Sequence, residues 1–501
     1  MYTYVLLNVC TMFAKYLPIQ TSTSVILPTD LQTFQSYSCR IRHIHLYSFK
    51  EKVSNHIYSS ITRHLFNRNS VYFPALRCFC ICWFANISEE NLLVLPLLSP
   101  SSLSTIEIRN VTSAIEIHLA SFLYGIAHLH PSSSTIYPLS FLRLEGMLTT
   151  STLAQIHYFK KLTTLDLILN GTNFPLAILS SLSKLPSLAK FKLVTVLYNR
   201  QLILDSKSSA KPIVYGFSNL ENLEVRGNVN VVLRILQSIH GERLLRVTLG
   251  LGAYLTNNAI KDNAIKACLK RSSEMAPRML FYSINVYGLE LTRGSRRFPI
   301  IRLPPDMFAP LPNNYGQLRS LIIDCMVFTI QHFCNLFDRA QVGLLWSALE
   351  ILKVHMIGRI VDPRRTWLVD QVVPLSSLSM VAASCPRLHT LELYLYYPLG
   401  EGDKETEVLT TYIQSSQPTD HKLTNLKIVF FDPFMMVPQP GDIVDAATVS
   451  RFIDHVFPNV QNFDIFDKVG DVRKEWYSEI KAMMKSYRDV TERTAAEEDP
   501  F

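Results

Sequence analysis

The chain has 501 residues, of which 48% are hydrophobic and 18% are charged, so it can build a continuous core and bulk disorder is not indicated. The formal net charge of +8 is modest for this length and argues against dedicated nucleic-acid binding. Nine cysteines without the spacing of a secreted module favour reduced thiols in a cytoplasmic or nuclear protein.

The first segment, residues 1–28, shows no clear hydrophobic period, and we expect an atypical, disordered N-terminus there. It carries a single charge, Lys15, and lacks a basic leading region, so a signal peptide is only weakly indicated. The longest apolar runs, such as Leu92–Leu98, are interrupted by proline and are too short to cross a bilayer. We therefore predict no membrane partner.

A repeated apolar triplet runs through the rest of the chain. The stretch Leu162–Asn170 reads L-x-x-L-x-L-x-x-N, which is the core of a leucine-rich repeat: a short strand followed by a turn. The same apolar offsets recur in both directions. In chain order the triplets begin at Ile41, Leu76, Leu103, Leu139, Leu162, Leu188, Leu220, Leu244, Phe281, Leu318, Leu349, Leu388, Leu423 and Val460. Each triplet alone is weak, but the series indicates a repeat protein.

Amphipathic stretches with helical spacing separate the triplets. They lie at Leu153–Lys161, Leu176–Lys184, Val231–His240, Ile260–Arg271, Ile330–Ala340, Leu375–Ser384 and Ala447–Val456. Most steps between triplets exceed the roughly 20–29 residues of compact repeats, which leaves room for a full helix in each. The predicted fold class is α/β: an irregular leucine-rich-repeat horseshoe, a solenoid with parallel strands on the concave face and helices on the convex face.

We expect residues 29–470 to form this solenoid as one domain. A C-terminal capping helix is predicted over 471–488, with Trp476, Ile480, Met483 and Tyr487 on one side, because the last repeat would otherwise expose its apolar face. An acidic disordered tail is predicted over 489–501. Long loops rich in Pro, Gly, Ser or charge are predicted at Tyr198–Tyr215, Gly288–Asn314, Gly358–Pro374 and Pro398–Asp420.

Motifs of catalysis and nucleotide binding are largely missing. Gly250-x-Gly252 follows a predicted strand, but the third glycine of a dinucleotide site is replaced by Leu255, so we interpret the pair as an ordinary turn. No stretch combines a nucleophile, a base and oxyanion donors. We therefore predict a protein that is not an enzyme and has no cofactor.

Two groups of residues, one of cysteines and one of histidines, have side chains that can bind a metal. Cys78-x-Cys80-x-Cys82 would place three thiols on one face of a strand, about 7 Å apart. Zinc more often uses a C-x₂-C knuckle, so reduced thiols are the stronger interpretation and metal binding the weaker one. His43 and His45 alternate in the same way, and we interpret them as solvated or hydrogen-bonded histidines. The sequence thus predicts no metal site.

Strand alternation assigns the residues that face away from the core. They carry both signs of charge along the whole series, as at Glu107, Arg143, Asp166, Lys192, Glu224, Lys353, Glu392, Lys427 and Asp464. A phosphate backbone would favour a stripe of one sign. We therefore predict a protein partner on the concave face and no nucleic acid.

The last three repeats differ from the others by their aromatic residues. By alternation, Tyr394, Tyr396, Phe431 and Phe466 should point outward on adjacent strands. Aromatic anchors ringed by charges are typical of interaction hot spots, so we predict a partner-binding site here. The alternative is that the Pro398–Asp420 loop or the capping helix covers these rings and makes them a small satellite core.

The run Leu31–Ile44 (LQTFQSYSCRIRHI) resembles the start of the repeat region in the F-box/leucine-rich-repeat family of mushroom-forming (basidiomycete) fungi, where a D-x-x-x-F-x-x-Y-A-x-R-V-R-x-L segment leads into the first repeat. Phe73–Arg77, Leu98–Leu103 and Cys385–Leu388 match further, and the likeness covers residues 28 to 466. The resemblance implies a substrate-recognition protein of SCF ubiquitin ligases, whose repeats capture substrate while an N-terminal F-box docks on the Skp adaptor.

The chain departs from that family at its N-terminus. The F-box opens with a signature like L-P-x-E-[IL], and Leu17–Gln20 (LPIQ) is its nearest approach. We expect the F-box to be missing or truncated and the Skp adaptor not to bind. The alternative function is a free-standing leucine-rich-repeat scaffold or inhibitor without a ubiquitin-ligase link.

Overall fold

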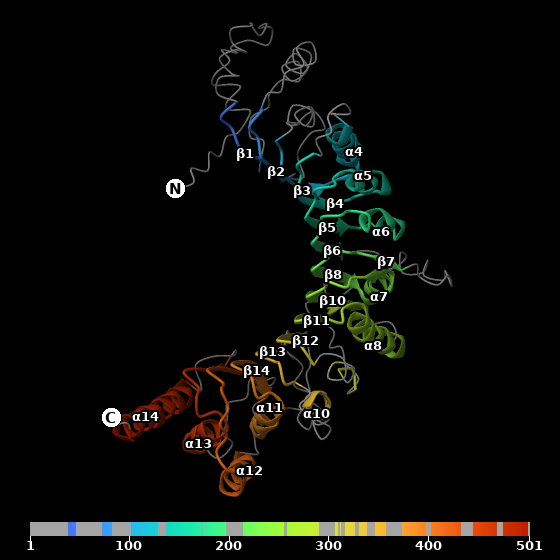
Figure 1. The fold of residues 1–501 in the computed structure, drawn as a ribbon. Helices are drawn as coiled ribbons and strands as arrows, with labels where there is room; N and C mark the ends of the chain where they lie inside the picture. The colour runs from blue at the N-terminus through green and yellow to red at the C-terminus, as the bar shows by residue number, and fades with distance from the viewer. Residues whose placement is uncertain are drawn as a thin grey trace. The chain divides into compact units, whose positions relative to one another are not determined.

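The computed structural model describes residues 39–46, 73–82, 102–128, 137–172, 174–196, 214–254, 258–289, 306–308, 311, 316–325, 330–337, 346–356, 373–396, 402–431, 444–467 and 474–498. They fall into two compact units. Figure 1 labels the helices and strands. Unit 1 holds the described residues up to Gly227 and Gln237–Arg243, and unit 2 holds Asn228–Leu236 and the described residues from Leu244 onward. The predicted solenoid over 29–470 therefore comprises two compact units.

Unit 1 is built on parallel strands that follow one another in chain order. They are β1 (His43–Leu46), β2 (Cys78–Cys82), β3 (Thr105–Val111), β4 (Phe141–Gly146), β5 (Thr164–Asn170), β6 (Lys190–Val196) and β8 (Asn222–Asn228). A separate short pair joins β7 (Tyr215–Gly216) to β9 (Ile239–His240). Between the strands lie α4 (Ser113–His128), α5 (Thr150–Gln155), η2 (Ile156–Tyr158) and α6 (Ala177–Leu182).

Unit 2 repeats the same plan. Its parallel strands are β10 (Arg246–Tyr254), β11 (Phe281–Leu289), β12 (Ser320–Cys325), β13 (Ile351–Met356), β14 (Thr390–Tyr396), β15 (Asn425–Phe431) and β16 (Asn462–Asp467). Its helices are α8 (Asn258–Met275), α10 (Ile330–Phe337), η6 (Leu375–Ser377), α11 (Leu378–Ser384), α12 (Gly402–Ser415), α13 (Ala446–Val456) and α14 (Lys474–Glu498). Helix α7 (Val229–Ser238) begins in unit 2 and ends in unit 1.

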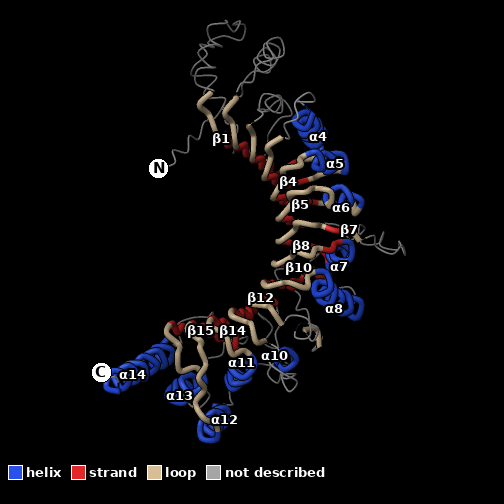
Figure 2. Tube along the Cα trace, in the orientation of Figure 1, coloured by secondary structure: helices blue, strands red, loops and turns tan. Residues whose placement is uncertain are grey.

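The repeat prediction is confirmed. Each of the predicted triplets contributes its last two apolar residues to a parallel strand, and the helices of each unit lie on one side of its strands (Figure 2). Parallel neighbours need a connection that crosses back along the sheet, and between β4 and β5 the segments α5 and η2 provide it. The fold class is therefore the predicted α/β solenoid of leucine-rich-repeat type.

Strand alternation explains where the core lies. In β5 the side chains of Leu165, Leu167 and Leu169 are fully buried, and they alternate with Thr164, Ile168 and Asn170, which are half-buried. Register places Leu165 between Leu142 of β4 and Phe191 of β6, and neither neighbour is more than 1% exposed. Each buried side chain of this size contributes about 1.5–3 kcal/mol, so a continuous apolar row under the helices stabilises the repeats.

A bulge interrupts the ladder between β3 and β4. Pairing shifts between Ile108 and Val111, where Asn110 adopts a left-handed backbone conformation at φ 59°. The shift brings the backbone of Val111 against Gly146, which itself has φ 138°. A Cβ at Gly146 would lie 2.3 Å from the carbonyl oxygen of Val111, so only glycine fits this close approach.

Two strand-level predictions need correction. The triplet predicted to begin at Phe281 is displaced by two residues: Tyr282 and Ile284 pair with Val247 and Leu249 and are buried, whereas Phe281 faces the other side with the Arg246 guanidinium 4.7 Å from its ring centre. The predicted turn at Gly250-x-Gly252 is also wrong. Both glycines lie within β10, whose ladder with β11 continues to Tyr254.

Helix predictions were incomplete in three places. Helix α12 occupies much of the predicted loop Pro398–Asp420, because Leu409 is fully buried and Tyr412 packs edge-on against Phe452, with ring centroids 5.5 Å apart. Helix α4 was not predicted. The capping helix is present as α14, which buries Tyr477, Ile480 and Met484, but it continues to Glu498 through the helix-favouring run Thr491–Glu498, where a disordered tail was expected.

The other predicted loops, and the predicted disordered segment 1–28, fall largely or wholly outside the described residues. Among the helices that the structure describes, none is both long and apolar enough to cross a membrane.

Candidate functional site

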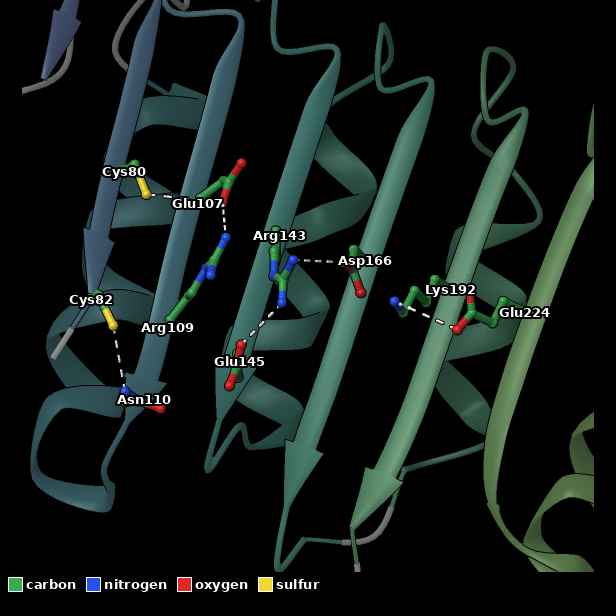
Figure 3. A network of polar contacts seen from close by, with 10 residues as sticks. All are labelled: Cys80, Cys82, Glu107, Arg109, Asn110, Arg143, Glu145, Asp166, Lys192 and Glu224. Carbon is green, nitrogen blue, oxygen red and sulfur yellow. Dashed lines mark hydrogen bonds and ion pairs between the residues drawn. The ribbon is translucent and has the colours of Figure 1, made fainter. Parts of the chain in front are cut away.

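In both units the side of the strands opposite the buried leucines carries polar side chains, and we call it the open face. In unit 1 its central row contains one residue from each of β3, β4, β5, β6 and β8, namely Glu107, Arg143, Asp166, Lys192 and Glu224 (Figure 3). The sign of the charge reverses at every step from strand to strand. These are positions that strand alternation predicts to point outward, and the register sets them side by side.

Ion pairs connect this row across and along the strands. Arg143 Nη1 lies 3.5 Å from Asp166 Oδ2, and Lys192 Nζ lies 3.5 Å from Glu224 Oε1. Along the strands, Arg109 pairs with Glu107 at 2.8 Å, and Arg143 also reaches Glu145 at 3.2 Å (Figure 3). Half-exposed pairs of this kind contribute roughly 0–1 kcal/mol each, so the network does more to shape the surface charge than to hold the fold.

Asp166 is the most enclosed member of the row. The residue is 8% exposed, and burial raises the pKa of its carboxyl group although Lys192 and Arg143 act in the opposite direction. Its Oδ2 faces Arg143, while Oδ1 is buried without a hydrogen-bond partner among the described residues. A buried carboxylate oxygen without a hydrogen bond is costly, which agrees with the raised pKa of this group.

The open face of unit 2 carries a second charged cluster, centred on Glu392 of β14. Its carboxylate accepts a short hydrogen bond from Lys427, and it lies 3.4 Å from Lys353 Nζ and 3.3 Å from His355 Nε2. Burial raises the pKa of Glu392, but the Lys427 hydrogen bond and the neighbouring positive charges outweigh it and hold that pKa below its usual value. The glutamate is therefore ionised at neutral pH.

His355 joins this cluster to the neighbouring strand β12. Its Nδ1 lies 2.8 Å from Asp324 Oδ1, and its ring meets Tyr394 edge-on, with ring centroids 5.4 Å apart. The hydrogen bond to Asp324 raises the pKa of His355, burial opposes that effect, and Glu392 adds to it. The imidazole is therefore protonated more readily than a free histidine.

A hollow of about 450 Å³ adjoins the cluster, between the open face of β14–β16 and helix α14. Its walls include Glu392, Lys427 and Asp464 from successive strands, and Lys481 Nζ of α14 lies 2.8 Å from Asp464 Oδ1. An amide row also lines it: Asn462 Nδ2 donates to Asn425 Oδ1 at 2.7 Å. The hollow therefore offers hydrogen-bonding groups together with apolar surface from Leu391, Leu426 and Phe463.

The predicted aromatic site lies on the strands next to this hollow. Tyr394 is half-buried on the open face, and burial raises the pKa of its hydroxyl. The strand register pairs Tyr396 with Phe431 and sets Phe466 opposite Val429, which is fully buried. The side chains of Tyr396, Phe431 and Phe466 lie outside the described residues. The partner site therefore stays a prediction at these four residues.

Sequence reasoning missed the hollow and the paired charges because both depend on which residues face each other across strands. A signal for them existed: Thr390, Asn425 and Asn462 occupy the same position of successive triplets, as do Glu392, Lys427 and Asp464. Aligning the triplets by their apolar residues would have placed these side chains in rows.

Among the described residues, Cys78, Cys80, Cys82, Cys268 and Cys385 form no disulfide. Cys78, Cys80 and Cys82 share the open face, as predicted. The Cys80 thiol donates to Glu107 Oε2 at 3.9 Å, and Cys82 Sγ accepts from Asn110 Nδ2 at 3.5 Å (Figure 3).

Comparison with known proteins adds little to this geometry. No family model and no curated protein matches the chain. Among solved structures, the chain is similar to a leucine-rich-repeat protein from Leptospira interrogans, with 11% sequence identity, a TM-score of 0.32 and 87% of each chain covered.

Proposed function

We propose that the protein is a repeat scaffold that binds another protein through its open face. The observation that carries this proposal is the charge pattern of unit 1: the sign alternates strand by strand from Glu107 to Glu224, and the charges largely pair with one another. Positive and negative side chains alternate over short distances on this surface, as hydrogen-bond donors and acceptors do on the surface of a folded protein. This pattern does not match the uniform charge of a nucleic acid.

In unit 2 the side chains around the hollow and the Glu392 cluster provide donors and acceptors, and Tyr394, Tyr396, Phe431 and Phe466 are the proposed aromatic anchors of the interface. Because the nine cysteines lack the spacing of a secreted module, we place this function in the cytoplasm or the nucleus.

Photo-crosslinking tests the proposed surface. A crosslinking amino acid at Lys190, which is exposed on the open face of β6, should capture a partner in cells. The same amino acid at Ile117, which is 68% exposed on helix α4, should not capture that partner. Crosslinks of equal yield from both positions, or from Ile117 alone, would contradict binding through the open face.

The resemblance to F-box/leucine-rich-repeat proteins supports a finer proposal: the bound protein is a substrate of an SCF ubiquitin ligase. The alternative is a free-standing scaffold or inhibitor without a ligase. Co-purification with the Skp adaptor separates the two. Stoichiometric recovery of the adaptor supports the ligase role, and a wild-type complex that contains the partner without the adaptor supports the scaffold.

A further inference from the structure

Strand pairing at the first two described strands brings together residues that are far apart in the sequence. His43 of β1 is opposite Cys78 of β2, and His45 is opposite Cys80. All four lie on the open face, because the residues that alternate with them, Ile44, Phe79 and Ile81, are at most 1% exposed on the other side. The arrangement thus gathers two imidazoles and two thiols on one surface.

Three of these side chains already cluster at close range. One ring nitrogen each from His43 and His45 and the Sγ of Cys78 all lie within 4.8 Å of one another. In a tetrahedral zinc site, with Zn–N of about 2.0 Å and Zn–S of about 2.3 Å, the donor atoms are separated by roughly 3.3–3.8 Å. His43 is exposed, and His45 and Cys78 are half-buried, so side-chain rotation can close the remaining gap without moving the strands.

We propose that His43, His45 and Cys78 form a binding site for a zinc-like divalent cation, with water in the fourth position. Two nitrogens and one sulfur suit a borderline-soft ion such as Zn²⁺, whereas Mg²⁺ and Ca²⁺ require oxygen ligands. Water is assigned to the fourth position because the cluster holds three donor atoms and Cys80 lies outside it, with its thiol directed to Glu107 Oε2 at 3.9 Å. Three protein ligands and one exchangeable position are typical of zinc sites that react with or bind a further group.

Negative charge lies next to the proposed site. Glu107 of β3 is opposite Cys80 in the strand register and accepts a hydrogen bond from its thiol. When a divalent cation binds, the Cys78 thiol loses its proton, and the thiolate and Glu107 offset the charge of the ion.

The ion would also connect β1 to β2. Two of its ligands come from one strand and the third from the next, so binding links the strands through their side chains as well as their backbones. Metal that binds only the folded protein stabilises it by mass action. We therefore expect Zn²⁺ to slow hydrogen exchange at the amides of Ile44 and Phe79 in the full chain.

The test uses the full chain, stripped with a chelator, and titrated with Zn²⁺ against a competing chromophoric chelator. The wild type should bind about one high-affinity ion, and Co²⁺ should give tetrahedral d–d bands and a thiolate-to-metal charge-transfer band. His43→Ala, His45→Ala and Cys78→Ser should each weaken Zn²⁺ binding by roughly tenfold or more, and Cys78→Ser should abolish the charge-transfer band. Because His43 is exposed, His43→Ala tests the site without altering the core.

Cys82→Ser is the matched control, since Cys82 lies on the same face of β2 and outside the cluster. It should bind Zn²⁺ as tightly as the wild type. Cys80→Ser should also retain the ion and the charge-transfer band, and loss of both would overturn the assignment of water to the fourth position. A wild type that binds no Zn²⁺, or His43→Ala and Cys78→Ser variants that bind it unchanged, would overturn the site itself.

Discussion

Replacing Leu165 with alanine tests the repeat packing at its centre. Leu165 is fully buried in β5, and its neighbours Leu142 and Phe191 in the same row are also buried. The substitution removes three carbon atoms, which at about 0.8 kcal/mol each gives about 2.4 kcal/mol of lost transfer free energy. A cavity that neighbouring strands only partly close adds to this loss, so we expect a total of about 3–4 kcal/mol.

Urea unfolding followed by circular dichroism measures the total loss, and hydrogen exchange locates it. Contacts in a repeat protein are mainly between neighbours, so protection should fall most in β4, β5 and β6 and least in β14–β16. Ile168→Ala is the control: Ile168 lies on the same strand but is half-buried on the open face, so its loss should cost less. A Leu165→Ala protein with the wild-type urea midpoint would refute the assigned packing.

Three further predictions address other parts of the chain. Gly146→Ala should lower the melting temperature, because its Cβ would overlap the backbone of β3 and the native φ is unfavourable for alanine. The hydrogen bond to Asp324 raises the pKa of His355, so the stability that it provides is present below about pH 6.5 and is lost as pH rises through the folded pKa. The melting-temperature difference between wild type and His355→Gln should therefore shrink from about pH 6 to about pH 9. Tyr394→Ala combined with Phe431→Ala should reduce partner binding without changing melting, whereas a large drop in melting temperature would show that the rings belong to a core.

Sequence periodicity predicts where the strands lie, but it does not predict the register of every strand. The triplets locate the strands because inward apolar side chains recur at fixed offsets, whatever lies between them. At β11 the segment Phe281–Val286 has apolar residues that fit two registers, and only pairing with β10 selects Tyr282 and Ile284. Helix α12 was not predicted because the glycines and charged residues around its start are typical of a loop. The burial of Leu409 depends on tertiary contacts, which the local sequence does not show.

The candidate sites were less predictable because they depend on contacts between strands. His43 and Cys78 are 35 residues apart. Each has residues of its own type nearby, His45 for the first and Cys80 and Cys82 for the second, but the mixed set of ligands forms only where β1 pairs with β2. The same holds for Arg143 and Asp166, whose pairing follows only from the ladder between β4 and β5. Alternation predicts which side chains face outward; register decides which of them meet.

The most direct test of protein binding through the open face is a pair of matched charge reversals. Lys192 lies in the alternating row between Asp166 and Glu224, and Lys184 is exposed just beyond helix α6. Once a partner has been isolated with the wild type, calorimetry gives its affinity for Lys192→Glu and Lys184→Glu. We predict that Lys192→Glu weakens binding by about tenfold or more while Lys184→Glu leaves it unchanged. Equal affinity of the partner for Lys192→Glu and the wild type, with weaker binding to Lys184→Glu, would contradict the proposed interface.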